Sequence, residues 1–307
     1  MRRTFLYIVA ILVTVFASFL VVRESINSKR KNVVVENNIV KENENKQNGT
    51  QNPEIKKPLD FNISGVDIDE RFQNENPQET ELSGWIKNLE SAKSINENAG
   101  KILENRAKYS DALLKLASNR VDAINFVYYT NDYKNRYVED YSESFALDRK
   151  FPLYIQWDPR FGYKYYDEYF ACVGCGPTCV SMIVNGFGEK KTPIDIMEEM
   201  VNNKAYISGV GTSWDGILRT IKAHGLNANE LPLMDNKFRD VIDNEGAVLL
   251  SMKPGQFTTG GHFLILIGID ENGNYLMNDP NSVRNSKKAW SYDEFANDIK
   301  GCWSIYK

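Results

Sequence analysis

Histidine and cysteine are scarce in this sequence, whose 307 residues include two His and four Cys. So few cysteines in a chain of this length exclude a small scaffold held together by disulfides. Any chemistry that needs an imidazole must use His224 or His262. The choice between these two residues therefore decides most of what the sequence can say about catalysis.

An excess of positive charge is also lacking, because the formal net charge is −4. Six of the 37 Lys and Arg, but one of the 41 Asp and Glu, lie in residues 1–31, which leaves −9 for the rest of the chain. Proteins that bind nucleic acid usually carry a basic patch or stripe. We therefore expect no nucleic acid among the partners of this protein. The hydrophobic content of 42% is ordinary for a globular chain and excludes a fully disordered one.

Long apolar runs are absent except at residues 4–22, which contain no charge and have arginines on both sides. A helix of that length reaches about 29 Å, close to the roughly 30 Å of a bilayer core. No A-x-A-like cleavage site follows Val22, and no cysteine lies nearby for lipid attachment. We predict an uncleaved single-pass anchor over 1–24, in contact with the lipid bilayer of the cell membrane, with a removed signal peptide as the alternative. The basic flanks leave the orientation open.

The chain beyond the anchor divides by composition. Residues 25–76 are rich in Asn, Lys, Glu and Gln, which predicts a disordered tether. Residues 77–150 carry apolar stripes at helical spacing, and we interpret these as the core of a helical lead-in segment. Residues 151–307 form the last predicted domain. Within it the patterns predict helices over 177–185, 193–202, 214–224 and 292–299, and strands over 247–252, 262–269 and 275–278. The predicted class is α+β.

Cys175 stands between two glycines and just before Pro177 and an apolar, helix-compatible run. Proline is favoured in the first turn of a helix, so Cys175 is predicted at a helix N-terminus. The partial positive charge there stabilises a thiolate. A thiolate nucleophile also needs a group that shares and delivers a proton, usually an imidazole.

His262 is the better placed of the two histidines, because it opens an apolar strand, whereas His224 falls in the last turn of a predicted helix and suits a structural role there. An Asn272-Gly273 turn predicts that the strand of His262 folds back along residues 275–278. That hairpin brings Asp279 towards the imidazole, where a carboxylate would hold the ring tautomer.

These residues and their surroundings resemble the stand-alone members of peptidase family C-thirty-nine, papain-like cysteine peptidases related to bacteriocin leader peptidases. The resemblance is carried by Gln-Trp-Asp-Pro-Arg-Phe-Gly at 156–162, Gly-Cys-Gly-Pro-Thr at 174–178, Gly-His-Phe at 261–263 and Asn-Asp-Pro at 278–280. It covers roughly 151–307. It implies a papain-like fold in which a helical half carries the Cys and an antiparallel sheet carries the His and Asp.

The resemblance implies Cys175 as nucleophile, His262 as general acid/base and Asp279 as its orienting partner. It also implies an oxyanion hole made by the Cys175 backbone N–H and the amide of Gln156. The leader peptidases carry this glutamine six residues before the cysteine, where this chain has Tyr169. No cofactor or metal is implied, and the expected partner is a peptide or protein substrate.

The predicted function is therefore that of a membrane-anchored, extracytoplasmic cysteine peptidase of bacterial type. Alternatives within the same fold are a cell-wall peptide amidase or acyltransferase, and a surface binding module without turnover. A zinc site would need nearly all the cysteines and a histidine, and a redox pair at Cys175 and Cys179 has three residues between the thiols instead of two. A disulfide between Cys172 and Cys302 stays open, and Cys179 is expected to pack in the core.

Overall fold

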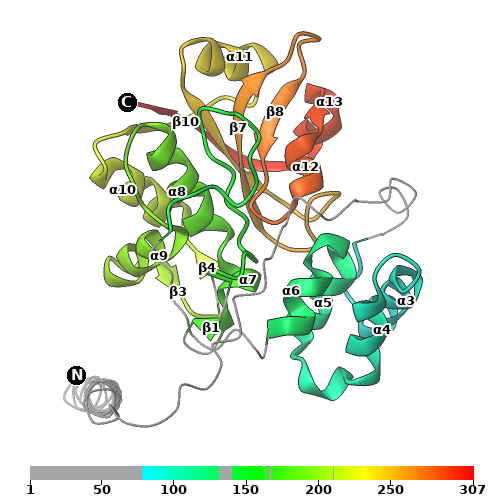
Figure 1. Cartoon of the computed structure of the whole chain (residues 1–307). Helices are drawn as coiled ribbons and strands as arrows, with labels where there is room; N and C mark the ends of the chain where they lie inside the picture. The colour runs from blue at the N-terminus through cyan, green and yellow to red at the C-terminus, as the bar shows by residue number, and fades with distance from the viewer. Residues whose placement is uncertain (1–77, 131–139, 163, 166–167, 210) are drawn as a thin grey trace, which may run out of the picture. The chain divides into compact units, whose positions relative to one another are not determined.

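A computed structural model describes residues 78–130, 140–162, 164–165, 168–209 and 211–307 (Figure 1). The chain divides into two units, Met1–Asp60 and Phe61–Lys307, and every described residue belongs to the second. The predicted anchor and tether lie outside the described residues. Among the helices that are described, none is long and apolar enough to span a bilayer.

Helices occupy both halves of the described chain. They are α3 (Leu82–Ala92), α4 (Glu97–Glu104), α5 (Asp111–Asn119), α6 (Ile124–Tyr129), α7 (Phe170–Val173), α8 (Cys175–Gly186), α9 (Pro193–Asn202), α10 (Trp214–Ala223), α11 (Asp235–Asp243), α12 (Val283–Lys287) and α13 (Tyr292–Phe295). The strands are β1 (Lys164–Tyr165), β2 (Glu168–Tyr169), β3 (Tyr206–Ile207), β4 (Gly211–Thr212), β5 (Asn227–Glu230), β6 (Ala247–Met252), β7 (His262–Ile269), β8 (Tyr275–Asn278), β9 (Ala289–Trp290) and β10 (Ile299–Tyr306).

The main sheet is antiparallel, with its six strands in the order β5-β10-β6-β7-β8-β9. Successive residues of a strand point to opposite faces. Accordingly Leu249 and Ile265 belong to the apolar core shared with α8, whereas Val248 and Leu264 belong to the core under α11 and α13. The sheet is thus buried on both faces, which is why β6 and the first part of β7 are almost continuously apolar.

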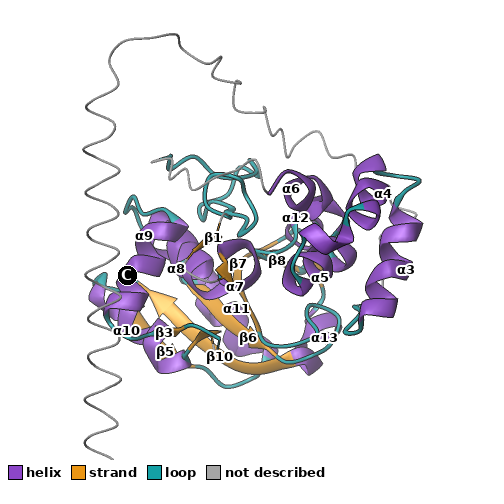
Figure 2. Ribbon diagram, turned by 90° about the horizontal axis from the view of Figure 1, so that it is seen from below, coloured by secondary structure: helices purple, strands orange, loops and turns teal. Residues whose placement is uncertain are grey.

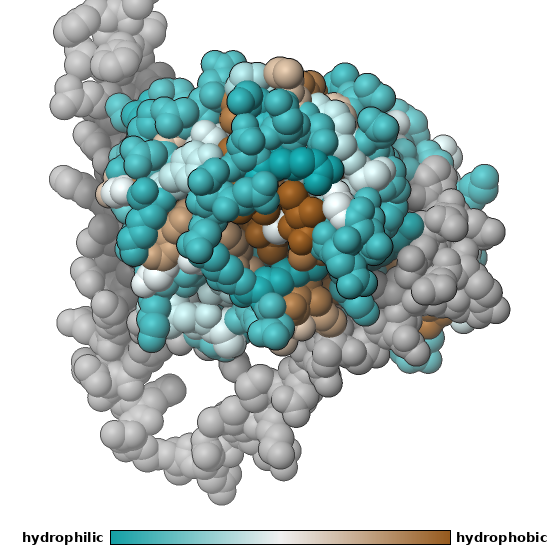
Figure 3. Space-filling model, turned by 90° about the horizontal axis from the view of Figure 1, so that it is seen from above, coloured by the Kyte–Doolittle hydropathy of each residue, from teal (hydrophilic) through white to brown (hydrophobic). Residues whose placement is uncertain are grey.

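The lead-in helices α3–α6 share the core of α8 and α9. They gather at one side of the molecule in two perpendicular views (Figures 1 and 2). Their apolar stripes are buried, as the spacing predicts, with Leu113, Leu116 and Val127 at most 6% exposed. On the face that carries α11, apolar residues are visible near the centre of a mainly hydrophilic surface (Figure 3).

The α+β class is confirmed, and so are the helix over 193–202 and the three predicted strands. The predicted helix over 292–299 is wrong at its end. Helix α13 stops at Phe295, a 3₁₀ turn covers Ala296–Asp298, and Ile299 pairs with Met252 as the first residue of β10. Two other helices differ from their predicted bounds by one or two residues. Helix α8 starts at Cys175, two residues before the predicted start, and α10 ends at Ala223, one residue before the predicted end. Strands β5 and β10 and helix α11 were not predicted.

Candidate active site

Cys175 is the first residue of α8 and is half-buried. Gly174 separates α7 from α8, and a Cβ atom at this position would lie 2.4 Å from the ring of Phe170. Only glycine therefore lets the chain turn this tightly before Cys175. The first N–H groups of a helix have no partner within it, so the proline at 177 costs no hydrogen bond there. The thiol stands at the positive end of the helix dipole.

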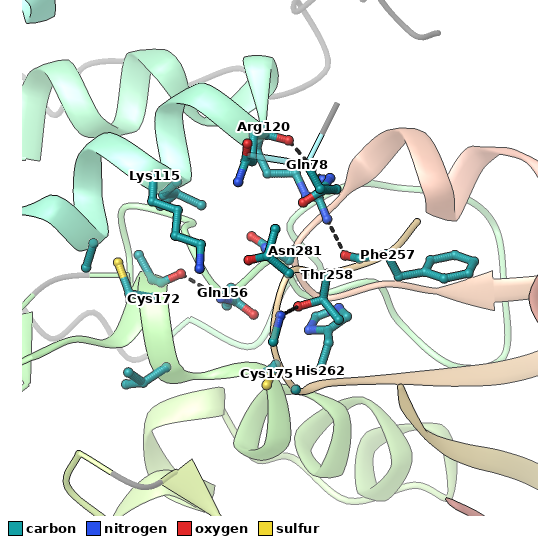
Figure 4. Close-up of a pocket in the computed structure, with 18 residues that line it drawn as sticks. Gln78, Lys115, Arg120, Gln156, Cys172, Cys175, Phe257, Thr258, His262 and Asn281 are labelled. Atoms are coloured by element: carbon teal, nitrogen blue, oxygen red, sulfur yellow. Dashed lines mark hydrogen bonds between the residues drawn. The ribbon is translucent and has the colours of Figure 1, made fainter. Parts of the chain in front are cut away.

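His262 opens β7 beside the start of α8, and its side chain is 5% exposed. Its Nε2 lies 2.7 Å from Oδ1 of Asp279, and the Cys175 thiol is close enough to raise the pKa of the imidazole. The pairing of β7 with β8 brings Asp279 back to this end of the sheet, as the hairpin predicts. The structure thus brings Cys175, His262 and Asp279 together (Figure 4 labels the first two).

The carboxylate of Asp279 is fully buried and held by several donors. Besides the imidazole, Oδ1 accepts the backbone N–H of Asn281 at 2.9 Å and Oδ2 accepts the Asn285 amide at 2.7 Å. Burial alone would raise the pKa of Asp279, but the charge and hydrogen bond of His262, the charge of Arg120 and the Asn285 amide lower it below its usual value. Asp279 is therefore an ionised, fixed acceptor.

The imidazole of His262 is set up to carry a proton. Burial by itself lowers its pKa, but the negative charge of Asp279 and the hydrogen bonds with Asp279 and Cys175 outweigh burial and raise the pKa to about 9. At neutral pH the ring is thus a cation between a carboxylate and a thiol. Such a ring can stabilise a thiolate and later give up its proton.

Gln156 lies in the same cavity as Cys175, with its side chain 3% exposed. Its Nε2 donates to the carbonyl of Ala171 at 2.6 Å, while its Oε1 is buried without a partner among the described residues. Tyr169, at the position where leader peptidases carry their glutamine, is not among the residues that line this cavity. Of Gln156 and Tyr169, Gln156 is therefore the residue that lines the cavity of Cys175 (Figure 4).

The cavity has a volume of about 290 Å³ and is built from six stretches of chain. The loop at 255–261, which includes the two glycines before His262, forms one wall. Helix α5 of the lead-in segment forms another, with Lys115, Leu116 and Asn119 facing the cavity. The spacing of its apolar residues predicts this helix as part of the core but does not predict that it lines the site. The sequence feature that could have indicated this role is Lys115, a charged residue within an otherwise apolar helical stripe.

Arg120 connects the lead-in segment to the cavity wall. It is 9% exposed, and its Nη2 donates to the carbonyl of Phe257 at 2.6 Å, while its Nε is buried without a partner among the described residues. Asp122 is buried close by, and burial raises its pKa to about 6 against the opposing charge of Arg120. The sequence patterns do not predict that Arg120 and Asp122 are buried together.

His224 has a different environment, in agreement with its expected structural role. It caps the end of α10, and its two ring nitrogens lie 2.8 Å from Glu189 and 2.8 Å from Glu199. Both nitrogens are therefore occupied. The residue links α10 to α9 and to the loop before it.

The other cysteines are free thiols that differ in burial. All four thiols are free, including Cys172 and Cys302, and Cys179 is fully buried as expected. Burial raises the pKa of Cys172 to about 12 and that of Cys179 well above its usual value. The described residues contain no group of three or more His, Cys, Asp or Glu arranged to hold a metal ion.

Comparison with known proteins gives one family match. Residues 149–307, about half of the chain, match the model of the Peptidase_C39 like family. No curated protein matches the chain.

Solved structures show a more distant likeness. The peptidase domain of Streptococcus ComA, a bi-functional ABC transporter involved in quorum sensing, is 18% identical over 44% of this chain and 90% of that chain, with a TM-score of 0.35. A double glycine motif protease from an AMS/PCAT transporter, solved in complex with the leader peptide, is 15% identical over 52% of this chain and 94% of that chain, with a TM-score of 0.32.

Proposed function

The chain belongs to the Peptidase_C39 like family, and on that basis we propose that it is a cysteine peptidase that cleaves peptide bonds through a thioester on Cys175. One observation carries the proposal. Cys175 at the start of α8 shares a cavity with an imidazole whose other side is held by the buried carboxylate of Asp279. This arrangement supplies a nucleophile, a proton carrier and an orienting group in contact with one another.

In the first half of the reaction, the Cys175 thiolate attacks the carbonyl carbon of the scissile bond. The negative charge that develops on the carbonyl oxygen is stabilised by donors at the helix start and by the amide of Gln156. The His262 imidazolium then gives its proton to the amine as the C–N bond breaks. The amine product leaves, and the acyl group stays on Cys175 as a thioester.

In the second half, water attacks the thioester and gives a proton to the now neutral His262. The C–S bond breaks, the acid product leaves, and the thiolate–imidazolium pair is restored. Asp279 keeps the ring oriented through both halves without taking the proton itself.

The proposed location is the outer face of the cell membrane. The apolar run at 4–22 would hold the chain in the bilayer, and the polar stretch at 25–76 would let the peptidase domain move away from it. The supporting observations here are the composition and length of these two segments.

The proposal is tested by replacing Cys175 with alanine. Cys175→Ala is expected to abolish hydrolysis of a mixed peptide library, read by mass spectrometry, and labelling by a thiol-reactive peptide electrophile. Cys179→Ala is the matched control, because this thiol is fully buried and is not among the residues that line the cavity, and the activity of the variant is expected to stay within about twofold of wild type. Circular dichroism checks that both variants fold.

Other outcomes would point elsewhere. Hydrolysis that survives Cys175→Ala would contradict the mechanism. A wild type whose Cys175 reacts but yields products joined to an added amine would be an acyltransferase. An unreactive Cys175 in a folded wild type would identify a binding module.

A further inference from the structure

The charged groups that line the cavity around Cys175 are all of one sign. They are Lys115, Arg120 and His262, and neither Asp nor Glu is among the lining residues that the structure describes. Asp279 balances the imidazole from beneath, but its carboxylate is fully buried and occupied. A cationic cavity is unexpected on a chain whose net charge is −4. Such a lining favours an occupant that carries negative charge.

Lys115 is the cation that remains available. Arg120 donates to the carbonyls of Asn119 and Phe257, and His262 is held between Asp279 and Cys175. Lys115 is half-buried on α5, has no ion pair with any described residue, and extends its side chain into the cavity towards Gln156 (Figure 4).

The charge of Lys115 acts on the thiol of Cys172, which also lines the cavity. Burial and the negative charge of Glu168 raise the pKa of that thiol, and the positive charge of Lys115 opposes them and lowers it. A positive charge in a partly enclosed site attracts an anion more strongly than one on an open surface, since less water screens the interaction.

We propose that Lys115 binds a carboxylate of the substrate close to the bond that is cleaved. The inference rests on the proposed peptidase function and adds a substrate class to it. An ammonium group that meets a carboxylate forms a charge-assisted hydrogen bond, stronger than one between neutral groups. The carboxylate comes either from an acidic side chain or from the C-terminus of the peptide.

Lys115 belongs to the lead-in segment and lies outside residues 149–307, which match the family. Selection of the substrate by charge would therefore be a property of this chain's own lead-in helix. The catalytic residues and the selecting residue would come from different parts of the sequence.

The test compares peptides that differ in one carboxylate. In the first set, acetylated and amidated octapeptides carry either Glu or Gln at one position, all other residues are neutral, and that position is varied along the peptide. In a further pair, all residues are neutral and the C-terminus is either a free acid or an amide. The values of kcat/KM are measured for wild type, Lys115→Gln and the control Lys87→Gln, which removes an equal charge from an exposed position on α3.

For wild type and Lys87→Gln, kcat/KM is expected to be at least tenfold higher for the acidic member of one peptide pair than for its neutral member. A preference in a Glu/Gln pair assigns the carboxylate to a side chain, and a preference in the terminal pair assigns it to the C-terminus. In Lys115→Gln the ratio of kcat/KM between the acidic and the neutral member of that pair is expected to fall to about twofold or less. A wild type that does not distinguish the pairs, or a Lys115→Gln variant that keeps the preference, would overturn the inference.

A binding measurement separates this inference from the proposed function. Titration of the same peptide pairs into Cys175→Ala, with and without Lys115→Gln, needs no turnover. Preference for the acidic member that depends on Lys115 supports the inference even if no peptide is cleaved. Absence of that preference overturns it even if cleavage is observed.

Discussion

At the scale of single residues, the two histidines differ in which ring nitrogens are occupied. His224 has a glutamate 2.8 Å from each nitrogen, so neither is available to a substrate or a thiol. His262 uses Nε2 for Asp279, and its ring also interacts with Cys175. His224 therefore stabilises the end of a helix, whereas His262 can transfer a proton.

The raised pKa of His262 predicts a pH-dependent contribution to stability. Because the pKa is higher in the folded state, at about 9, than the usual 6.5, the contribution is fully present below about pH 6.5 and is lost as the pH rises through 9. Asp279 stays ionised throughout this window, since its pKa is lowered. Urea unfolding of wild type and His262→Gln is expected to give a larger difference in free energy at pH 6 than at pH 10, by an amount on the order of 3 kcal/mol.

An equal difference between wild type and His262→Gln at the two pH values would contradict this assignment. Peptide hydrolysis by wild type should decline over the same interval around pH 9, because the imidazolium that protonates the leaving amine disappears.

At the scale of elements, α5 and residues 257–261 line the same cavity although they are far apart in sequence. The hydrogen bond from Arg120 to the carbonyl of Phe257 joins residues separated by 137 positions. Since the same loop leads directly into His262, the position of the lead-in helices is coupled to the position of the imidazole.

Arg120→Met keeps most of the side-chain volume and removes every donor. Loss of a charged hydrogen bond at a buried site is expected to reduce the free energy of unfolding by roughly 2 kcal/mol. Amide hydrogen exchange is expected to accelerate at residues 257–261, and kcat/KM to fall. Arg106→Met, at an exposed position in the same segment, is the control and should change neither. A slowly exchanging loop in Arg120→Met would show that the hydrogen bond does not position it.

The elements that sequence patterns predict best are those with strong local signals. Pro193 with a capping box around Thr192 and Asp195 marks the start of α9, and the Asn-Gly turn at 272–273 fixes the pairing of β7 with β8. Hence the proximity of His262 and Asp279 at one end of the sheet could be predicted. Strand β10 could not, because its residues pair with β5 and β6 across long sequence separations and carry no turn signal of their own.

The same reasoning explains which site residues escaped prediction. Lys115 and Arg120 reach the cavity only because α5 packs beside α7 and the 255–261 loop. Asn285 reaches Asp279 because α12 follows β8 closely. Such contacts are set by tertiary packing, which a local pattern does not contain.

At the scale of the whole molecule, composition separates three parts with different physical roles. The run at 4–22 is apolar, the stretch that follows is polar, and the rest of the chain is acidic overall and folds around two apolar cores. If the chain is anchored as proposed, an anionic lipid surface would repel its acidic part, because like charges repel.

The proposed anchor predicts how the protein partitions between membrane and solution. The full chain is expected in the membrane pellet after an alkaline carbonate wash, and deletion of residues 1–24 should release it with unchanged peptide hydrolysis. Deletion of residues 33–56 removes the same length from the tether and should leave the protein in the membrane. A mature protein whose mass lacks the first 24 residues would show a removed signal peptide instead.

The position of β10 has a consequence for how the chain folds. Strands β6, β7, β8 and β9 follow one another and can pair hairpin by hairpin, but β10 must enter between β5 and β6 from much later in the chain. Until it does, β6 is an unprotected edge made of six residues that are all buried in the finished protein. An apolar edge strand of this kind is a template for pairing with another molecule. Association of partly folded chains through β6 therefore competes with the pairing of β10 to β6. Dilution slows the association but not the pairing within one chain, so it favours the native fold.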